Sequence, residues 1–505
     1  MAFTSEELQQ PPSAAALSES LRGVGYSVET ALADLVDNSI SAEARNVWIS
    51  IGSVTGVARV AVVDDGSGMS REVVLQAMRP GSRSPLETRD AQDLGRFGLG
   101  LKTASFSHCR CLSVATREAN SAVYSLRWDL DLVASTDRWQ LVEGLDPDLA
   151  QELDVIRRLP PERGATLVMW SHVDQVPQLT GTQRQRAELL SRIRGHLGMV
   201  FHRFLEEKRL TIHLGLDPDP LANGAITPWN PFVPDRSHLL PGEMVRVGGI
   251  WCSFKGYVLP HRDRCTEQEW EEAAGPGGWV AQQGFYVYRN QRMLVDGDWL
   301  RLNRGWRKDE LYKLARIQLD FDSHLDSHWK IDIKKSRATP PKELKDKLRD
   351  LAMRVRQESE RVFAHRGSRR RRASYAGPTN DVVPVWQVSS STDSLRFRIN
   401  RDHPLVRCAL EDSSRTEGVL QLLEKHVPAA RIWLEMNRQA DITHREESFT
   451  EAEARGAIGD LFAYLVESCD FSLPQARERI LDTEPFDQHS DVVDAVLAEL
   501  GVKQE

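Results

Sequence analysis

The sequence predicts an α+β protein in which helices pack on one face of a mixed sheet. A helical pattern over residues 27–44 is followed by a strand-like stretch, 47–52, and by an apolar strand, 57–69, that ends in a glycine-rich turn. Three later stretches alternate β-branched and aromatic residues as strands do: 111–118, 121–131 and 165–173. Strands joined by short turns therefore outnumber long helices, which indicates a layer of helices against a sheet.

The rest of the chain predicts a second α+β unit and a helical tail. A helix over 183–208 and a charged amphipathic helix over 341–366 enclose several strand-like stretches. An arginine- and serine-rich linker follows, and then a short strand-like start with at least three helical stretches. We expect five parts: an N-terminal segment (1–26), a first domain (27–180), a second domain (181–360), an Arg-rich linker (361–380) and a small, mainly helical C-terminal domain (381–505).

Length and charge exclude several classes of protein. At roughly 150 residues per domain, 505 residues correspond to about three domains. The chain has 65 basic and 73 acidic residues and a net charge of −8, which excludes a uniformly basic nucleic-acid coat but allows a local basic patch. The sequence shows no apolar run near the roughly 20 residues that span a bilayer, no secretory signal and no disulfide framework. We expect a soluble cytoplasmic protein that does not contact a membrane.

The first motif that carries chemistry is Asp34-Leu35-Val36-Asp37-Asn38. Asp34 and Asn38 are four residues apart, so on a helix they lie on one face. A carboxylate beside an amide can orient a water and complete the shell of a Mg²⁺ ion, which prefers oxygen ligands and shares its octahedron with nucleotide phosphates. The alternative is an ordinary polar helix face that ends near Asn38.

Two further motifs fit a flat ligand. Asp64 and Asp65 follow an apolar strand and precede Gly66, Gly68 and Met69, and two glycines allow the backbone to pass close to such a ligand. Asp64 could accept a hydrogen bond from an exocyclic amine such as that of adenine. Later in the chain, Thr166 begins a strand after a glycine, and its hydroxyl could support the same contact. A plain Asp-Gly turn is the alternative.

A glycine-rich segment between these motifs fits an anion. Its glycines follow the pattern G-x-x-G-x-G, and a helix of small residues begins directly after them. Backbone N–H groups at a helix N-terminus bind anions, and a lysine adds a positive charge. The spacing differs from that of a Rossmann fingerprint or a P-loop. The residues concerned are Gly95, Arg96, Phe97, Gly98, Leu99, Gly100, Leu101 and Lys102.

Together the four motifs resemble the nucleotide-binding domain of the gyrase, heat-shock chaperone, histidine kinase and MutL (GHKL) superfamily. Their order and spacing match over about 150 residues, and the stretches 20–42 and 95–107 are most similar to MORC ATPases and their bacterial MutL-like relatives. The resemblance implies a Bergerat-type α/β sandwich that binds ATP and Mg²⁺. It implies that Asn38 coordinates Mg²⁺, that Asp64 binds adenine between Gly66 and Gly68 with help from Thr166, and that the glycine-rich segment with Lys102 holds the phosphates.

One residue departs from the family pattern. The usual general base of the superfamily is a glutamate four residues before the asparagine, and this chain has Asp34 there. The missing methylene withdraws the carboxylate by more than about 1 Å, a displacement to which catalysis is sensitive. We therefore expect slow hydrolysis in which Asp34 is the base; the alternative is a shifted helix that restores the reach of Asp34.

The second domain resembles the transducer domain of MutL and MORC proteins, on the stretches 284–302 and 315–341. In those proteins a lysine after a strand reaches the γ-phosphate. Here the resemblance implies Lys335 or Lys334, with a slight preference for Lys335, and such a cation stabilises charge during phosphoryl transfer. A solvated strand end with two lysines is the alternative.

These resemblances lead to a hypothesis of function. We expect an ATP-gated clamp in which residues 1–26 reach a second copy of the chain, so that an ATP-dependent homodimer encloses duplex DNA. Six arginines and no acidic residue lie within 361–372, which suits phosphate contacts or a plain linker. The family context suggests bacterial restriction or antiviral (phage) defence, with nuclease, helicase or methyltransferase partners. The alternative is a chaperone-like ATPase that acts on protein clients.

Overall fold

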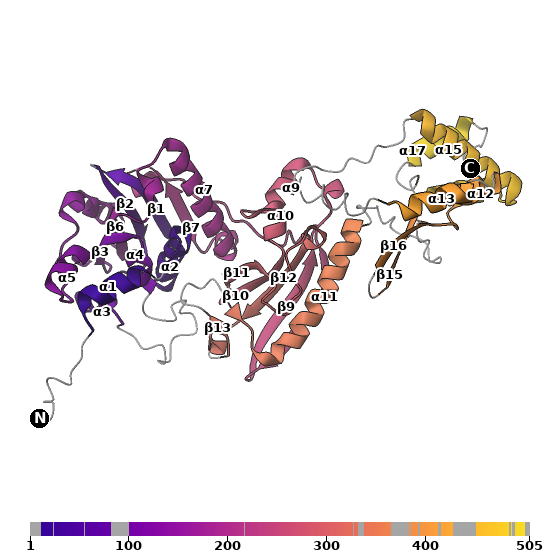
Figure 1. Ribbon diagram of the computed structural model, residues 1–505. Helices are drawn as coiled ribbons and strands as arrows, with labels where there is room; N and C mark the ends of the chain where they lie inside the picture. The colour runs from indigo at the N-terminus through magenta and orange to yellow at the C-terminus, as the bar shows by residue number, and fades with distance from the viewer. Residues whose placement is uncertain are drawn as a thin grey trace, which may run out of the picture. The chain divides into compact units, whose positions relative to one another are not determined.

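The computed structural model divides the chain into two units, residues 1–367 and residues 368–505 (Figure 1). Each unit has its own hydrophobic core. The residues that the structure describes are 12–23, 25–54, 56–81, 100–216, 218–326, 328–331, 338–364, 383, 385–391, 394–412, 416–427, 451–483, 486 and 490–499.

A seven-stranded mixed sheet forms the centre of the first domain (Figure 1). Its strands lie in the order β5–β4–β3–β6–β2–β1–β7, and β1 and β7 are parallel whereas the other neighbours are antiparallel. The strands are β1 (Asn46–Val54), β2 (Val57–Asp64), β3 (Cys109–Arg117), β4 (Tyr124–Asp129), β5 (Val142–Glu143), β6 (Ala165–Val173) and β7 (Thr211–Gly215).

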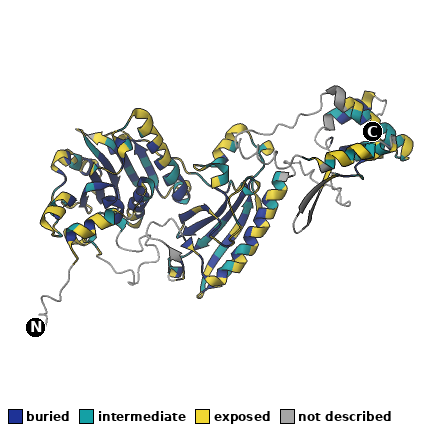
Figure 2. Cartoon of the chain, in the orientation of Figure 1, coloured by how far each residue is buried: buried dark blue, intermediate teal, exposed yellow. Residues whose placement is uncertain are grey.

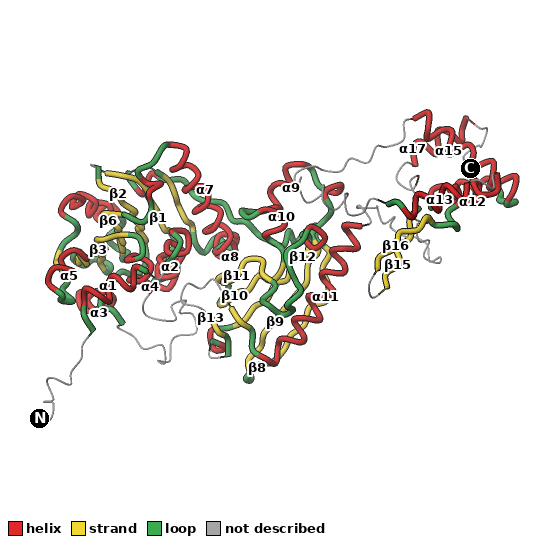
Figure 3. Tube along the Cα trace, viewed as in Figure 1, coloured by secondary structure: helices red, strands yellow, loops and turns green. Residues whose placement is uncertain are grey.

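Helices cover one face of this sheet (Figure 3). The core on that face joins buried residues of the helices, such as Leu32 and Val36, to strand residues such as Ile49 and Val114. The helices that line this core or flank it are α1 (Ala14–Arg22), α2 (Val28–Ser41), α3 (Arg71–Met78), α4 (Gly100–Phe106), α5 (Leu130–Thr136), α7 (Gln183–Val200) and α8 (His202–Glu206). The predicted α+β class is confirmed.

A smaller cover lies on the opposite face. There Val63 and Leu167 of the sheet share a core with Leu149 and Ile156, which belong to the short helices η1 (Pro147–Leu153) and α6 (Asp154–Arg158). The sequence predicted helices on one face only. These two elements are too short to give a clear helical periodicity, so they were not expected.

The first sheet extends past the domain boundary that we placed at residue 180. Strand β7 pairs with β1, and α7 packs against α2, so residues up to Gly215 belong to the first layer. The helix expected over 183–208 is divided at Phe201, whose backbone is not helical, into α7 and α8. The second sheet therefore begins after this extension rather than at residue 181.

A five-stranded sheet in the order β11–β10–β12–β9–β8 builds the second domain. Its strands are β8 (His238–Val247), β9 (Ile250–Val258), β10 (Gly284–Arg289), β11 (Arg292–Asp298) and β12 (Ala315–Phe321). The long helix α11 (Lys342–Ala364) covers one face, and Figure 2 shows its alternation of buried and exposed sides. Leu344, Leu348, Leu351 and Val355 are buried at the three- and four-residue spacing of an amphipathic helix. Two short helices, α9 (Glu267–Ala274) and α10 (Gly278–Ala281), and the strand pair β13 (Lys330–Ile331) and β14 (Ala338–Thr339) complete the domain.

The second unit is a small, mainly helical domain, as predicted. It begins with the hairpin β15 (Trp386–Ser391) and β16 (Ser394–Ile399) and continues with α12 (Pro404–Asp412), α13 (Thr416–Lys425), α15 (Glu451–Ala463), α16 (Leu473–Leu481) and α17 (Ser490–Glu499). Ile458, Leu461, Ile480 and Val493 lie at the centre of its core. Among the described residues of the whole chain, none forms a helix with the length and apolar character required to cross a membrane.

Candidate functional site

Helix α2 carries the first motif beside the edge of the seven-stranded sheet at which β2 ends. Ser27 caps its N-terminus by accepting a hydrogen bond from the Thr30 N–H at 3.2 Å. The predicted helical spacing is present, so Asp34 and Asn38 occupy one face one turn apart. Asp34 is buried, with 2% of its surface exposed, whereas Asn38 is exposed near the end of the helix. An exposed amide above a buried carboxylate can offer an oxygen ligand to an ion in solvent.

The carboxylate of Asp34 faces the start of α4. A Cβ placed on Gly100, the first residue of α4, would lie 3.7 Å from Oδ2 of Asp34. The structure thus brings together the first motif and the last glycine of the glycine-rich segment, which are 66 residues apart in the sequence. Gly100 begins a helix, as expected.

Asp64, the last residue of β2, is buried with 6% of its surface exposed. Its carboxylate accepts hydrogen bonds from the Ser39 hydroxyl at 2.9 Å and from the Gly66 N–H at 3.0 Å. Burial raises the pKa of Asp64 to about 6, against the smaller lowering by these two donors. The carboxylate is ionised at neutral pH and can accept a further hydrogen bond from an amine.

At two positions in these motifs, Gly68 and Gly164, another backbone segment lies so close that no side chain would fit. Gly68 has a φ of +69°, and a Cβ on it would lie 1.8 Å from the Arg117 carbonyl oxygen. A Cβ on Gly164 would lie 2.0 Å from the Ser67 carbonyl oxygen. The turn after β2 and the start of β6 therefore touch through their backbones, and only glycine allows this contact.

Thr166 lies directly across from Asp64 in the antiparallel pairing of β2 with β6. Its hydroxyl is 3.1 Å from that of Thr116 in β3, and the Thr116 hydroxyl also accepts a hydrogen bond from the Met69 N–H at 3.0 Å. Thr116 and Ser39 thus belong to the Asp64 site, although the motifs did not point to them. Ser39 could have been found from its place one residue after Asn38, whereas Thr116 could not be found without the β3–β6 pairing.

Asp65 has a structural role beside the site. Its carboxylate accepts hydrogen bonds from the N–H groups of Arg45 and Asn46, both at 2.8 Å, and from the guanidinium of Arg163 at 2.8 Å. These contacts hold the chain before β1 and the turn before Gly164 around the end of β2. Of two adjacent carboxylates, only Asp64 faces α2.

Lys102 has a partner that the sequence did not predict. Its ammonium group donates a hydrogen bond to the carbonyl oxygen of Ala77 at 2.8 Å, near the C-terminus of α3, where carbonyl groups attract a cation. The side chain is buried, and burial lowers its pKa to about 8. In this structure Lys102 fastens α4 to α3, and its contact with phosphate stays a prediction.

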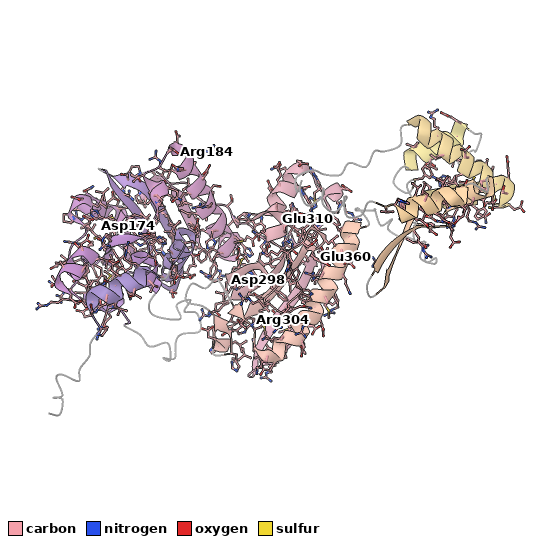
Figure 4. All side chains as sticks on the ribbon, in the orientation of Figure 1. Asp174, Arg184, Asp298, Arg304, Glu310 and Glu360 are labelled. Atoms are coloured by element: carbon pink, nitrogen blue, oxygen red, sulfur yellow. The ribbon has the colours of Figure 1, made fainter. Side chains whose placement is uncertain are left out.

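Some of the predicted site residues lie outside the described residues. In the glycine-rich segment these are Gly95, Arg96, Phe97, Gly98 and Leu99, and in the second domain they are Lys334 and Lys335. Of the N-terminal segment, α1 packs within its own chain: Arg22 donates to the carbonyl oxygens of Phe106 and Cys109 and pairs with Asp174, which Figure 4 marks. The reach of residues 1–26 to a second copy stays a prediction, and residues 1–11 and 24 lie outside the described ranges.

Comparison with known proteins agrees with this geometry. A family model described as "Histidine kinase-, DNA gyrase B-, and HSP90-like ATPase" matches residues 26–159. Over the matched residues, the first domain is therefore similar to the ATPases of this family. The match begins just before α2 and contains all the predicted site residues from Asp34 to Lys102, whereas Thr166, Lys334 and Lys335 lie beyond it.

A curated relative matches a shorter stretch. ATPase morc-1 from Caenorhabditis elegans is 34% identical over 89 residues, which make up 18% of this chain and 10% of that protein. The chain thus covers about a tenth of the length of this relative. The similarity supports a GHKL ATPase domain of the MORC-like kind, as the motifs indicated.

Proposed function

We propose that the ATPase domain binds ATP with Mg²⁺ and hydrolyses it slowly. The observation that carries this proposal is the buried carboxylate of Asp64 at the end of β2, held by Ser39 and by the Gly66 N–H within a turn that only glycine permits. A buried acceptor at a tightly packed turn suits a planar base with an exocyclic amine. Around it, Gly66, Gly68, Met69 and Thr166 would line the base.

The remaining motifs would surround the phosphates and the metal ion. Asn38 would supply an oxygen ligand to Mg²⁺, which neutralises phosphate charge when bound. Asp34, one turn earlier, would accept the proton of the attacking water. The glycine-rich segment, residues 95–101, and Lys102 would contact phosphate oxygens, and Lys335 or Lys334 would contact the γ-phosphate.

The same proposal extends to a clamp. ATP binding would shift the chain toward a closed homodimer, because a ligand favours the state to which it binds more tightly. The dimer would act on duplex DNA, with the arginines of 361–372 as phosphate contacts, in a bacterial defence system with nuclease, helicase or methyltransferase partners. The support for these steps is the sequence resemblance to MORC and MutL ATPases and the arginine-rich stretch.

The ATPase rate of the full chain, with and without duplex DNA at several salt concentrations, tests this proposal. We expect a slow Mg²⁺-dependent rate that DNA raises, and an effect of DNA that falls steeply with salt because phosphate contacts release counterions. Sedimentation with a non-hydrolysable ATP analogue should show a dimer that ADP does not give. A rate that DNA leaves unchanged but an unfolded protein client raises would favour the chaperone-like alternative, and equal dimerisation in ADP would contradict the clamp.

A further inference from the structure

A buried ion pair joins the ATPase domain to the second domain next to the proposed metal ligand. Nε of Arg292, the first residue of β11, lies 3.2 Å from Oδ1 of Asp37 in α2. The side chains expose only 4% and 1% of their surfaces. Two opposite charges withdrawn from water to this degree stabilise each other, because each offsets part of the cost of burying the other.

The position of Asp37 within α2 gives this pair its significance. Asp37 directly precedes Asn38 and follows Asp34 by three residues, so its carboxylate is fixed to the same helical turn as both proposed site residues. A displacement of Asp37 therefore moves the Asn38 amide. Arg292 of the second domain thus contacts the helical turn of α2 that carries Asp37 and Asn38.

Arg292 is itself held rigidly at the tip of a hairpin. Strands β10 and β11 are joined by Asn290 and Gln291, both with positive φ, as in a tight two-residue turn. On the strand side of this turn, Arg289 forms two hydrogen bonds of 2.8 Å with the carboxylate of Asp326. The guanidinium of Arg292 also donates to the Met293 carbonyl oxygen at 2.7 Å. At the hairpin tip, the guanidinium of Arg292 is thus held by the Met293 carbonyl oxygen as well as by Asp37.

We propose that Arg292 is a positioning residue for the nucleotide site, which sets the last turns of α2 through Asp37 and thereby places Asn38 for Mg²⁺. The inference rests on the proposed function and deepens it. Mg²⁺ demands near-ideal octahedral geometry, so metal-dependent nucleotide binding is the property most sensitive to a shift of Asn38. Nucleotide binding in the first domain would in this way depend on the hairpin of the second domain.

The chain offers a matched control at the same junction. Arg203 of α8 pairs with Asp320 of β12 and also lies over the ring of Tyr288, 3.6 Å from its centre. This pair likewise connects a helix next to the first sheet with a strand of the second sheet, but it does not contact α2. Loss of Arg203 weakens the junction without acting on the turn that carries Asn38.

The test measures ATP affinity of the full chain by calorimetry, once with Mg²⁺ and once with EDTA. Arg292→Gln and Asp37→Asn should each lower the affinity for ATP in Mg²⁺ by about tenfold, a usual size for coupling between sites, and change the affinity in EDTA much less. The double variant should be no weaker than either single variant, because both remove the same interaction. Arg292→Lys should restore part of the Mg²⁺ effect, and Arg203→Gln should leave the Mg²⁺-to-EDTA ratio at the wild-type value.

The outcomes separate this inference from the proposed function. If wild-type protein does not bind ATP, the proposed function fails. If wild-type protein binds ATP but Arg292→Gln keeps the wild-type Mg²⁺-to-EDTA ratio, or Arg203→Gln lowers it equally, then the positioning role is wrong. If a single variant unfolds because it buries one charge of the pair without the other, the double variant, which removes both charges, decides. A wild-type Mg²⁺-to-EDTA ratio in the double variant overturns the inference, and a lowered ratio supports it.

Discussion

Replacement of Asp64 by asparagine should abolish ATP binding. In the absence of nucleotide, the same replacement should stabilise the folded protein at pH 8. Burial raises the pKa of this carboxyl from its ordinary value of 3.8 to about 6. At about 1.4 kcal/mol per pKa unit, keeping the carboxylate ionised in the folded chain at pH 8 costs about 3 kcal/mol. Asparagine avoids this cost, but it has only one acceptor oxygen for the two donors, the Ser39 hydroxyl and the Gly66 N–H. The loss of one hydrogen bond lowers the free energy of unfolding by about 1 kcal/mol.

The net gain is therefore about 2 kcal/mol at pH 8, or a rise in Tm of about 4–8 °C for a domain of this size. The gain depends on pH in a defined direction. Below about pH 4 the carboxyl is protonated in both the folded and the unfolded chain, so the cost is absent. The cost grows between about pH 4 and pH 6 and is complete above about pH 6. The advantage of Asp64→Asn should therefore disappear as the pH is lowered from 8 to 4.

Thermal unfolding without nucleotide at pH 8, 6 and 4 checks the predicted change in stability, and calorimetry with ATP at pH 8 checks the predicted loss of binding. The amide NH₂ of asparagine faces the amine of the base donor to donor, so we expect ATP affinity to fall by more than about a hundredfold. A stability difference that is the same at all three pH values would refute the assignment of a buried charge. Unchanged ATP affinity would refute the assignment of Asp64 to adenine.

Variants at three further residues, Asp34, Gly164 and Lys335, give additional tests. Asp34→Asn should lower ATP turnover by about a hundredfold or more while ATP still binds, and Asp34→Glu should raise turnover because the longer side chain restores the reach of the carboxylate. Steady-state phosphate release measures both effects, and wild-type turnover in Asp34→Asn would exclude Asp34 as the base. Gly164→Ala should lower the free energy of unfolding by more than about 2 kcal/mol in denaturant unfolding, because the new Cβ would meet the Ser67 carbonyl oxygen. The control is Gly224→Ala, whose new Cβ has no atom within 4 Å, and it should change stability by less than about 0.5 kcal/mol. Lys335→Ala should weaken ATP-dependent dimerisation in sedimentation more than it weakens ATP binding, with Lys334→Ala as the control; an equal loss in both variants would leave the preference for Lys335 without support.

Local patterns in the sequence were sufficient to predict the framework of the site. The four-residue spacing of Asp34 and Asn38 on a helix, and the position of Asp64 between a strand and a glycine turn, depend on neighbours in sequence. The positions of Thr116 and Arg292 depend on strand pairing and on contacts over a long sequence separation. Such contacts leave no local periodicity, so the sequence could not indicate them.

The boundary at residue 180 has a similar explanation. A helix followed by a strand at 183–216 is equally consistent with the end of one domain and the beginning of the next. Only the parallel pairing of β7 with β1 assigns this segment to the first sheet. Lys102 also shows this limit, because a lysine at the start of a helix suggests an anion, while its actual hydrogen-bond partner, the Ala77 carbonyl oxygen, comes from a separate helix.

Calorimetric titration of the full chain with ATP, in Mg²⁺ and then in EDTA, determines whether Asp64 and Asn38 belong to one site. In such a site, Asp64 would recognise adenine and Asn38 would recognise the metal ion. Wild-type protein should bind ATP more tightly with Mg²⁺, Asn38→Ala should lose that Mg²⁺ advantage while it still binds in EDTA, and Asp64→Asn should bind under neither condition. If Asp64→Asn binds ATP with wild-type affinity, or if Asn38→Ala keeps the full Mg²⁺ advantage, the two residues do not form one nucleotide site.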